Sequence, residues 1–184
     1  MARVAFVPAS DLPANVARIY EQYAIGYGQF RNQVAVFAHV PCAVEHIMGL
    51  LLDLKQQRNL NWRYVELAIV VTSKLNACRY CVAHHTPPLR VEGLSEAAIE
   101  MLPALHEELD EVDRLVVDYT VAVTNSAQRI PERIFDALRA HFSEAQIVEL
   151  TLRIALCGFF NRFNDALMID AEPAALAHGE ERHA

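Results

Sequence analysis

Apolar residues recur along most of the chain at intervals of three and four, which is the spacing of one buried helix face. Together with helix-start and helix-stop residues, this spacing predicts helices over residues 12–30, 30–40, 42–57, 61–74, 76–86, 95–106 and 108–127, from 131 onward, and over 143–159. The strict alternation of a half-buried strand persists nowhere. The pattern therefore predicts an all-α helical bundle.

Two local signals set expected boundaries near the middle of the chain. Asn76 is a good N-cap residue, so the helix that follows it should begin there. Pro87 and Pro88 lack the backbone N–H that a helix interior needs, so we expect them to stop or kink that helix.

A short internal similarity suggests two related helical halves. The segment 63–69 resembles 146–152, at an offset of 83 residues, and each contains Val-Glu-Leu. At the same offset, Asn161 and Asn164 fall at the positions of Cys78 and Cys81. Because Val-Glu-Leu is a common tripeptide, chance similarity stays open as the alternative.

Composition and charge describe a globular protein with an acidic surface. The 184 residues fit a single domain over 1–184, 53% of them are hydrophobic, and the net charge is −7. Binding to nucleic acid or to an anionic membrane needs clustered Lys and Arg, so we expect neither partner. The chain has no apolar run near the ~20 residues of a membrane span, and its first residues do not resemble a signal peptide. We therefore expect a cytoplasmic location.

The spacing of the four cysteines indicates chemistry at one place. Cys78 and Cys81 are three residues apart, whereas Cys42 and Cys157 are isolated in the sequence. In a reducing compartment a close pair indicates redox chemistry or a metal more often than a structural bridge. Zinc usually needs four ligands, and the pair with one neighbouring histidine supplies three at most, so we favour redox chemistry and expect no metal.

A helix from Asn76 would place the pair and a base together. Cys78 would lie in its first turn, where unpaired backbone N–H groups favour a thiolate. Cys81 follows one turn later, so the two sulfurs can form a disulfide. His85, four residues after Cys81, shares its face and can accept the thiol proton, whereas His84 points elsewhere and is taken as incidental.

Glu66 is the second unusual residue. It is the only charged side chain between Tyr64 and Ser73, in a helix apolar enough to be buried nearly all round. A buried carboxylate needs a partner. The turn after this helix folds the chain back, so His85, or a water held by the thiols, is the expected partner.

These residues resemble the carboxymuconolactone decarboxylase superfamily, and within it the alkylhydroperoxidase D-like branch. That branch has a Glu, a CxxC motif that begins twelve residues later, and a His four residues after the second Cys. Glu66, Cys78, Cys81 and His85 meet each spacing. The similarity covers about residues 18–170, which we take as the core of the domain, and it includes Ser73, Asn76 and the run 161–164.

The resemblance implies an all-α fold, usually a homo-oligomer, that reduces hydroperoxides without a bound cofactor. Cys81 would attack the peroxide and become a sulfenic acid, which Cys78 would resolve to a disulfide. Glu66 and His85 would relay the proton that activates Cys81. A dithiol donor, such as a lipoyl group on a partner protein, would restore the reduced form. Helix-start reasoning by itself favours Cys78 as the first thiolate, and here we follow the family.

One departure from the family pattern keeps other functions open. The best-known peroxidase of the branch has a His next to the second cysteine, where this chain has Tyr80, so one member of the proton relay is missing. The alternatives are a lactone decarboxylase-type enzyme that uses a His as general acid and base, and a non-catalytic oligomer that senses redox state through its disulfide.

Overall fold

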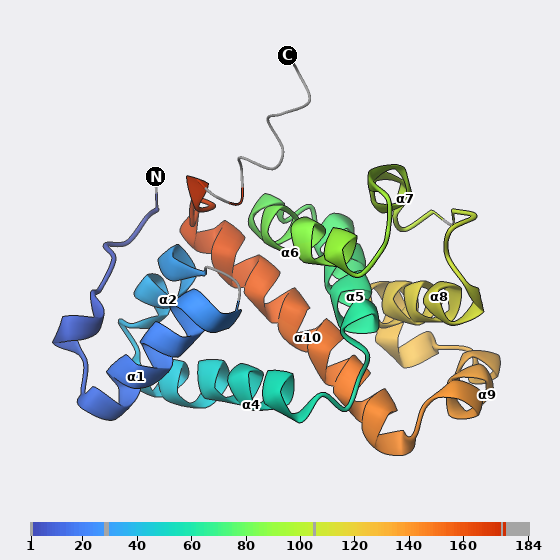
Figure 1. Ribbon diagram of the computed structural model, residues 1–184, viewed down its shortest axis with the longest axis horizontal. Coiled ribbons are helices and arrows are strands. Elements are labelled where there is room, and N and C mark those ends of the chain that lie inside the picture. Colours follow the sequence, from blue (N-terminus) through green and yellow to red (C-terminus); the bar gives the residue numbers. More distant parts are fainter. Residues whose placement is uncertain (1, 28–29, 105, 174, 176–184) are drawn as a thin grey trace, which may run out of the picture. The chain divides into compact units, whose positions relative to one another are not determined.

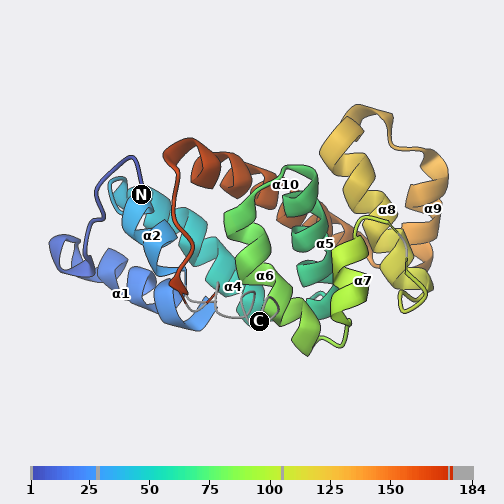
Figure 2. The same ribbon diagram turned by 90° about the horizontal axis from the view of Figure 1, so that it is seen from above.

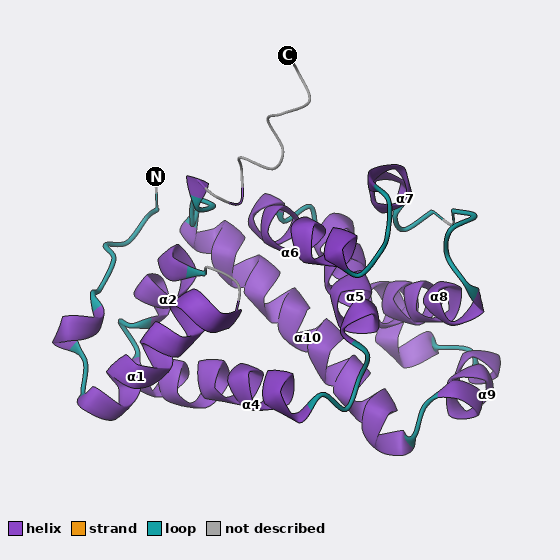
Figure 3. Cartoon of the chain, viewed as in Figure 1, coloured by secondary structure: helices purple, strands orange, loops and turns teal. Residues whose placement is uncertain are grey.

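The computed structural model describes residues 2–27, 30–104, 106–173 and 175, and this part of the chain contains helices and loops but no strand (Figures 1 and 3). The predicted all-α fold is confirmed. The residues group into two compact units: unit 1 consists of Met1–Asn59 and Asn164–Ala184, and unit 2 of Leu60–Phe163. The single domain expected over 1–184 stays a prediction. Within the described ranges, no helix has both the length and the apolar character needed to cross a membrane.

Unit 1 is built from short helical segments around a small apolar core. Val34, Val44 and Met48 are fully buried at its centre. The rings of Tyr23 and Tyr27 stack with their centroids 5.0 Å apart. The segments in chain order are η1 (Ala9–Asp11), α1 (Ala14–Gln22), the π-helical turn η2 (Tyr23–Tyr27), α2 (Arg31–Phe37), α3 (Pro41–Ala43), the π-helical turn η3 (Val44–Met48) and α4 (Gly49–Gln57).

Unit 2 is organised around one buried helix, α5 (Trp62–Leu75). It lies between α6 (Arg79–Val91) and α8 (Glu111–Ser126) and packs against both, as both views show (Figures 1 and 2). Arg63 at the start of α5 donates to the buried Asp113 of α8 at 2.7 Å. The remaining segments are α7 (Glu96–Met101), η4 (Ala127–Arg129), α9 (Glu132–His141) and α10 (Glu144–Leu167), whose last turn belongs to unit 1.

Several of the expected boundaries are wrong. The helix expected over 12–30 is interrupted by η2, and the one expected over 95–106 ends at Met101. Pro87 and Pro88 do not end α6, which continues to Val91. Leu89 is fully buried in the core of unit 2, so packing of the last turn offsets the backbone hydrogen bonds that the two prolines remove.

The internal similarity does not mark two equal compact units. Both similar segments lie in unit 2. The first is followed by the turn between α5 and α6, whereas the second lies in α10, which continues without a break from Glu144 to Leu167.

Candidate active site

Helix α5 positions the first candidate residue, Glu66. Nine consecutive residues from Val65 to Ser73 are buried, and Glu66 is the only ionisable one among them, with 2% of its surface exposed. Its Oε2 lies 2.7 Å from Nδ1 of His85 on α6. His85 was one of the two partners expected for Glu66, and the structure brings these two side chains together.

The same contact fixes the orientation of the imidazole. His85 is itself buried, with 8% of its surface exposed. Beside a carboxylate, Nδ1 is assigned as the donor, which puts the basic lone pair of a neutral ring on Nε2. Glu66 therefore holds a buried base in one tautomer.

The two cysteines lie at the start of α6. Cys78 is the N-cap residue and Cys81 is the third residue of the helix; both are reduced and buried. The expectation that Asn76 is the N-cap is wrong, because Asn76 belongs to the turn that ends α5. The backbone N–H of Cys78 donates to Ser73 O at 2.9 Å, so the chain leaves α5 only at that point.

This correction changes the comparison of the two thiols. Cys78 caps α6 and Cys81 is in its first turn, so both residues lie at the positive end of the helix dipole. Helix-start reasoning therefore no longer singles out Cys78 over Cys81 as the thiolate.

A polar cluster that the sequence did not predict lies behind this turn. Asn161 of α10 donates through Nδ2 to Ser73 Oγ (3.2 Å) and accepts through Oδ1 from Asn76 Nδ2 (2.8 Å). Cys157, one turn earlier on α10, has its sulfur 3.3 Å from Ser73 Oγ. The signal in the sequence was the internal similarity, which aligned Asn161 with Cys78.

Cys157 differs from the CxxC cysteines in its surroundings. Cys157 is buried, and this burial raises the pKa of its thiol to about 12. Cys157 therefore stays protonated at neutral pH, which separates it from thiols that react as thiolates.

Tyr80 and His84 form an aromatic pair on α6. Their ring centroids are 4.5 Å apart and both side chains are buried. His84, expected to be incidental, packs on the tyrosine that stands in place of the family histidine. The phenol thus contributes a packed aromatic ring to this end of α6.

The structure offers little to the metal alternative. In the described part of the chain, no three His, Cys, Asp or Glu side chains are grouped so that they could share a metal ion. Cys42 is exposed in unit 1, and His39 in the same unit bonds through Nε2 to Ala5 O at 2.8 Å.

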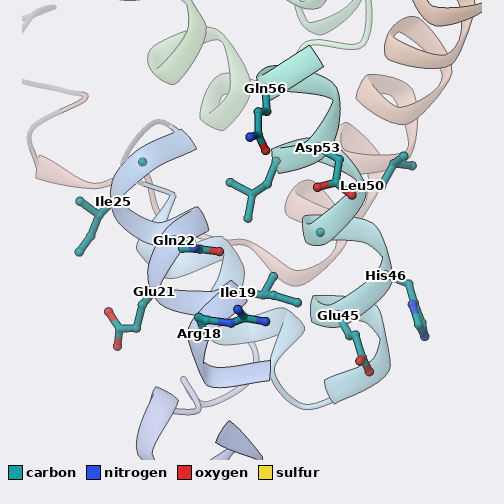
Figure 4. A pocket seen from close by; sticks show the side chains of 13 residues that line it. Arg18, Ile19, Glu21, Gln22, Ile25, Glu45, His46, Leu50, Asp53 and Gln56 are labelled. Atoms are coloured by element: carbon teal, nitrogen blue, oxygen red, sulfur yellow. The ribbon is translucent and has the colours of Figure 1, made fainter. Parts of the chain in front are cut away.

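A surface groove in unit 1 is formed by other residues. Glu66, His85 and the CxxC cysteines do not line it. Ile25 and Leu50 are exposed there beside charged side chains (Figure 4). The lining residues are Arg18, Ile19, Glu21, Gln22, Ile25, Gly26, Glu45, His46, Gly49, Leu50, Leu52, Asp53 and Gln56. The candidate chemistry therefore lies in unit 2, outside this groove.

Comparison with known proteins finds a family match over the segment that carries the candidate residues. The model of the carboxymuconolactone decarboxylase family matches residues 41–106, a stretch that includes all four candidate residues. The uncharacterized protein YdfG of Bacillus subtilis (strain 168) is 28% identical over 127 residues, which cover 65% of this chain and 86% of YdfG.

Two solved structures have a similar fold. One is the Agrobacterium tumefaciens protein ATU0492, described as a protein of unknown function and putative antioxidant defence protein AhpD. It has a TM-score of 0.65 and 29% identity over 73% of this chain and 94% of its own. The other is the alkylhydroperoxidase AhpD core of an uncharacterized peroxidase-related protein from Ralstonia eutropha JMP134. It has a TM-score of 0.80 and 23% identity over 95% of this chain and 94% of its own. The CxxC segment of this chain is thus similar to the carboxymuconolactone decarboxylase family, and its all-α fold is similar to the folds of alkylhydroperoxidase D-like proteins.

Proposed function

We propose that this protein is a thiol-dependent peroxidase that reduces hydroperoxides through Cys81 and Cys78, with Glu66 and His85 as its proton relay. The observation that carries the proposal is the 2.7 Å contact between Glu66 Oε2 and His85 Nδ1. His85 lies on α6, the helix that begins at the two cysteines. A base held next to a thiol by a third group is the general arrangement that activates a sulfur nucleophile.

In the first step, His85 takes the proton from Cys81. The two residues are four apart on α6, so they share a helix face, and the first-turn N–H groups favour the resulting thiolate. The sulfur attacks one peroxide oxygen, an S–O bond forms and the O–O bond breaks. The sulfur is oxidised to a sulfenic acid, and the departing alkoxide takes the proton from His85 and leaves as the alcohol.

In the second step, Cys78 attacks the sulfenic sulfur of Cys81. The S–S bond forms, the S–O bond breaks, and hydroxide leaves with the thiol proton of Cys78 as water. An external dithiol, such as a lipoyl group on a partner protein, then reduces the disulfide by thiol–disulfide exchange and is itself oxidised. The cycle needs no bound cofactor or metal.

The description of one similar structure supports a peroxidase function. ATU0492 is described as a putative antioxidant defence protein. We expect a homo-oligomer, as is usual in the family, and a cytoplasmic location, where the reducing environment would keep the thiols reduced between turnovers.

The test is peroxide-dependent oxidation of a small dithiol by purified protein. Cys81→Ser should abolish turnover, and Cys78→Ser should stop after one oxidation with a sulfenic acid that dimedone captures. Cys42→Ser, which changes an exposed cysteine in unit 1, is the matched control and should keep full activity.

Three outcomes would reject the peroxidase. Full activity in both CxxC variants would rule out the dithiol mechanism. Decarboxylation of a lactone acid that survives loss of both cysteines would establish the decarboxylase alternative. A clean dithiol–disulfide transition without turnover on any hydroperoxide would establish the redox sensor.

A further inference from the structure

The turn that carries Cys78 has an unusual backbone for its sequence. Cys78 N–H donates to Ser73 O (2.9 Å) and Ala77 N–H donates to Lys74 O (3.1 Å), which together are the two hydrogen bonds of a Schellman helix end. The residue between them is left-handed in this motif, and glycine is usual there. Here it is Ala77, with φ of 56°.

The left-handed alanine implies that this turn needs outside support. A residue with a Cβ is disfavoured in that conformation by about 1–2 kcal/mol relative to ordinary backbone. Ala77 itself is exposed, so its own side chain cannot anchor the turn in the core. The support has to come from other residues of the turn and from the segment packed against it.

Asn161 provides that support from α10, a helix more than 80 residues away in sequence. Its carboxamide holds two residues that precede Ala77, donating to Ser73 Oγ and accepting from Asn76 Nδ2. Asn161 and Ser73 are both buried, with 1% and 0% of their surfaces exposed, so water does not compete for these bonds.

The hydrogen bonds around Asn161 continue to Cys157. Ser73 Oγ accepts from Asn161 and lies 3.3 Å from the sulfur of Cys157, a contact in which either group can donate. The Cys157 thiol, kept protonated by burial, can donate to Ile69 O at 3.5 Å or to Asn161 Oδ1 at 3.8 Å. This series of buried contacts ties the end of α5 to α10.

We infer that Asn161 is a positioning residue for the Cys78–Cys81 pair. It touches neither reacting sulfur, and it acts through the turn that fixes Cys78 as the N-cap of α6, one turn before Cys81. The inference rests on the proposed function for its kinetic effect, which is on the second step alone: attack of Cys78 on the Cys81 sulfenic acid, with S–S bond formation and loss of water.

The variant that tests this role of Asn161 is Asn161→Ala, and Asn164→Ala is its control. Asn164 is one turn further along α10, equally buried, and accepts a hydrogen bond from Gln33 in unit 1 at 3.0 Å. Both variants lose a buried amide, and the first removes the two hydrogen bonds to Ser73 and Asn76.

We expect Asn161→Ala to react with tert-butyl hydroperoxide at the wild-type rate and to close its disulfide about tenfold more slowly, since the hydrogen bonds lost are of the size that corresponds to roughly a factor of ten. Dimedone should then trap more sulfenic acid than in the wild type. Asn161→Asp, which keeps the oxygen that accepts from Asn76 but loses the donor to Ser73, should fall between the two.

Equilibrium with a dithiol redox buffer tests the inference without any peroxide. A tenfold lower equilibrium constant for disulfide formation in Asn161→Ala corresponds to a reduction potential about 30 mV less negative. If the wild type ignores hydroperoxides, the proposed function fails while this shift still supports the positioning role.

A second variant covers the case in which Asn161→Ala does not fold. Asn76→Ala removes only the partly exposed end of the series and should change disulfide closure and potential in the same direction by a smaller amount. Wild-type closure rate and potential in the Asn161 and Asn76 variants would overturn the inference. Equal changes in Asn164→Ala would overturn it too, because they would trace the effect to general loss of packing.

Discussion

Replacement of Glu66 by glutamine isolates the charge of the proposed relay. The amide has nearly the same shape as the carboxylate, so the packing of α5 against α6 is kept. What is lost is the charge-assisted hydrogen bond between Oε2 and Nδ1 of His85, and with it the fixed tautomer of the ring.

The contact sets the size of the expected effect. A hydrogen bond to a charged group is worth about 1.5–3 kcal/mol. Each ~1.4 kcal/mol of transition-state stabilisation is tenfold in rate. Oxidation of Cys81 by a hydroperoxide should therefore slow by roughly 10- to 150-fold in Glu66→Gln. The free energy of unfolding should change by less than about 1 kcal/mol, because the substitution also removes the cost of burying a charge.

The assay is single-turnover loss of thiols after mixing with tert-butyl hydroperoxide, with urea unfolding measured on the same samples. Asp113→Asn is the matched control, since Asp113 is the other fully buried carboxylate of unit 2 and pairs with Arg63 rather than with the thiol site. The control should lose about 3 kcal/mol of stability and keep its oxidation rate per folded molecule. A Glu66→Gln rate within twofold of the wild type would refute the relay.

Two further outcomes follow from the packing of unit 2. Burial raises the folded-state pKa of Cys157 from 9.0 to about 12, so the stability that the buried thiol contributes is complete below pH ~9 and is lost as pH rises toward ~12. In unfolding experiments, the stability difference between wild type and Cys157→Ala should therefore shrink across that range. A constant difference would contradict the burial of this thiol. Leu89→Ala should lower the free energy of unfolding by about 2–5 kcal/mol, because Leu89 anchors the turn that follows Pro87 and Pro88 in α6. Amide hydrogen exchange should then be faster in that turn. Unchanged protection would show that the prolines need no such anchor.

The pairing of Glu66 with His85 could be predicted because all its determinants are local. A single charge in a buried helix requires a partner, and the next helix of the hairpin carries a histidine at a fixed spacing from the cysteines. The same reasoning gave the all-α fold, since helical periodicity persists through nearly every segment.

The errors arose where contacts between distant segments override local preference. Asn76 is a better N-cap than Cys78 by intrinsic preference, but Asn161 of α10 binds it into the end of α5. Pro87 and Pro88 are helix breakers by the same standard, and the burial of Leu89 keeps the helix intact. The roles of α10 at this site could not be predicted, because nothing near the CxxC motif encodes them.

The most direct test of the central claim is a thiol count before and after one equivalent of an organic hydroperoxide, in the wild type and in Cys81→Ser. We expect rapid loss of two thiols in the wild type, a Cys78–Cys81 disulfide in its peptide map, and no comparable loss in the variant. Two CxxC thiols that stay reduced in the wild type, or the same loss in Cys81→Ser, would contradict it.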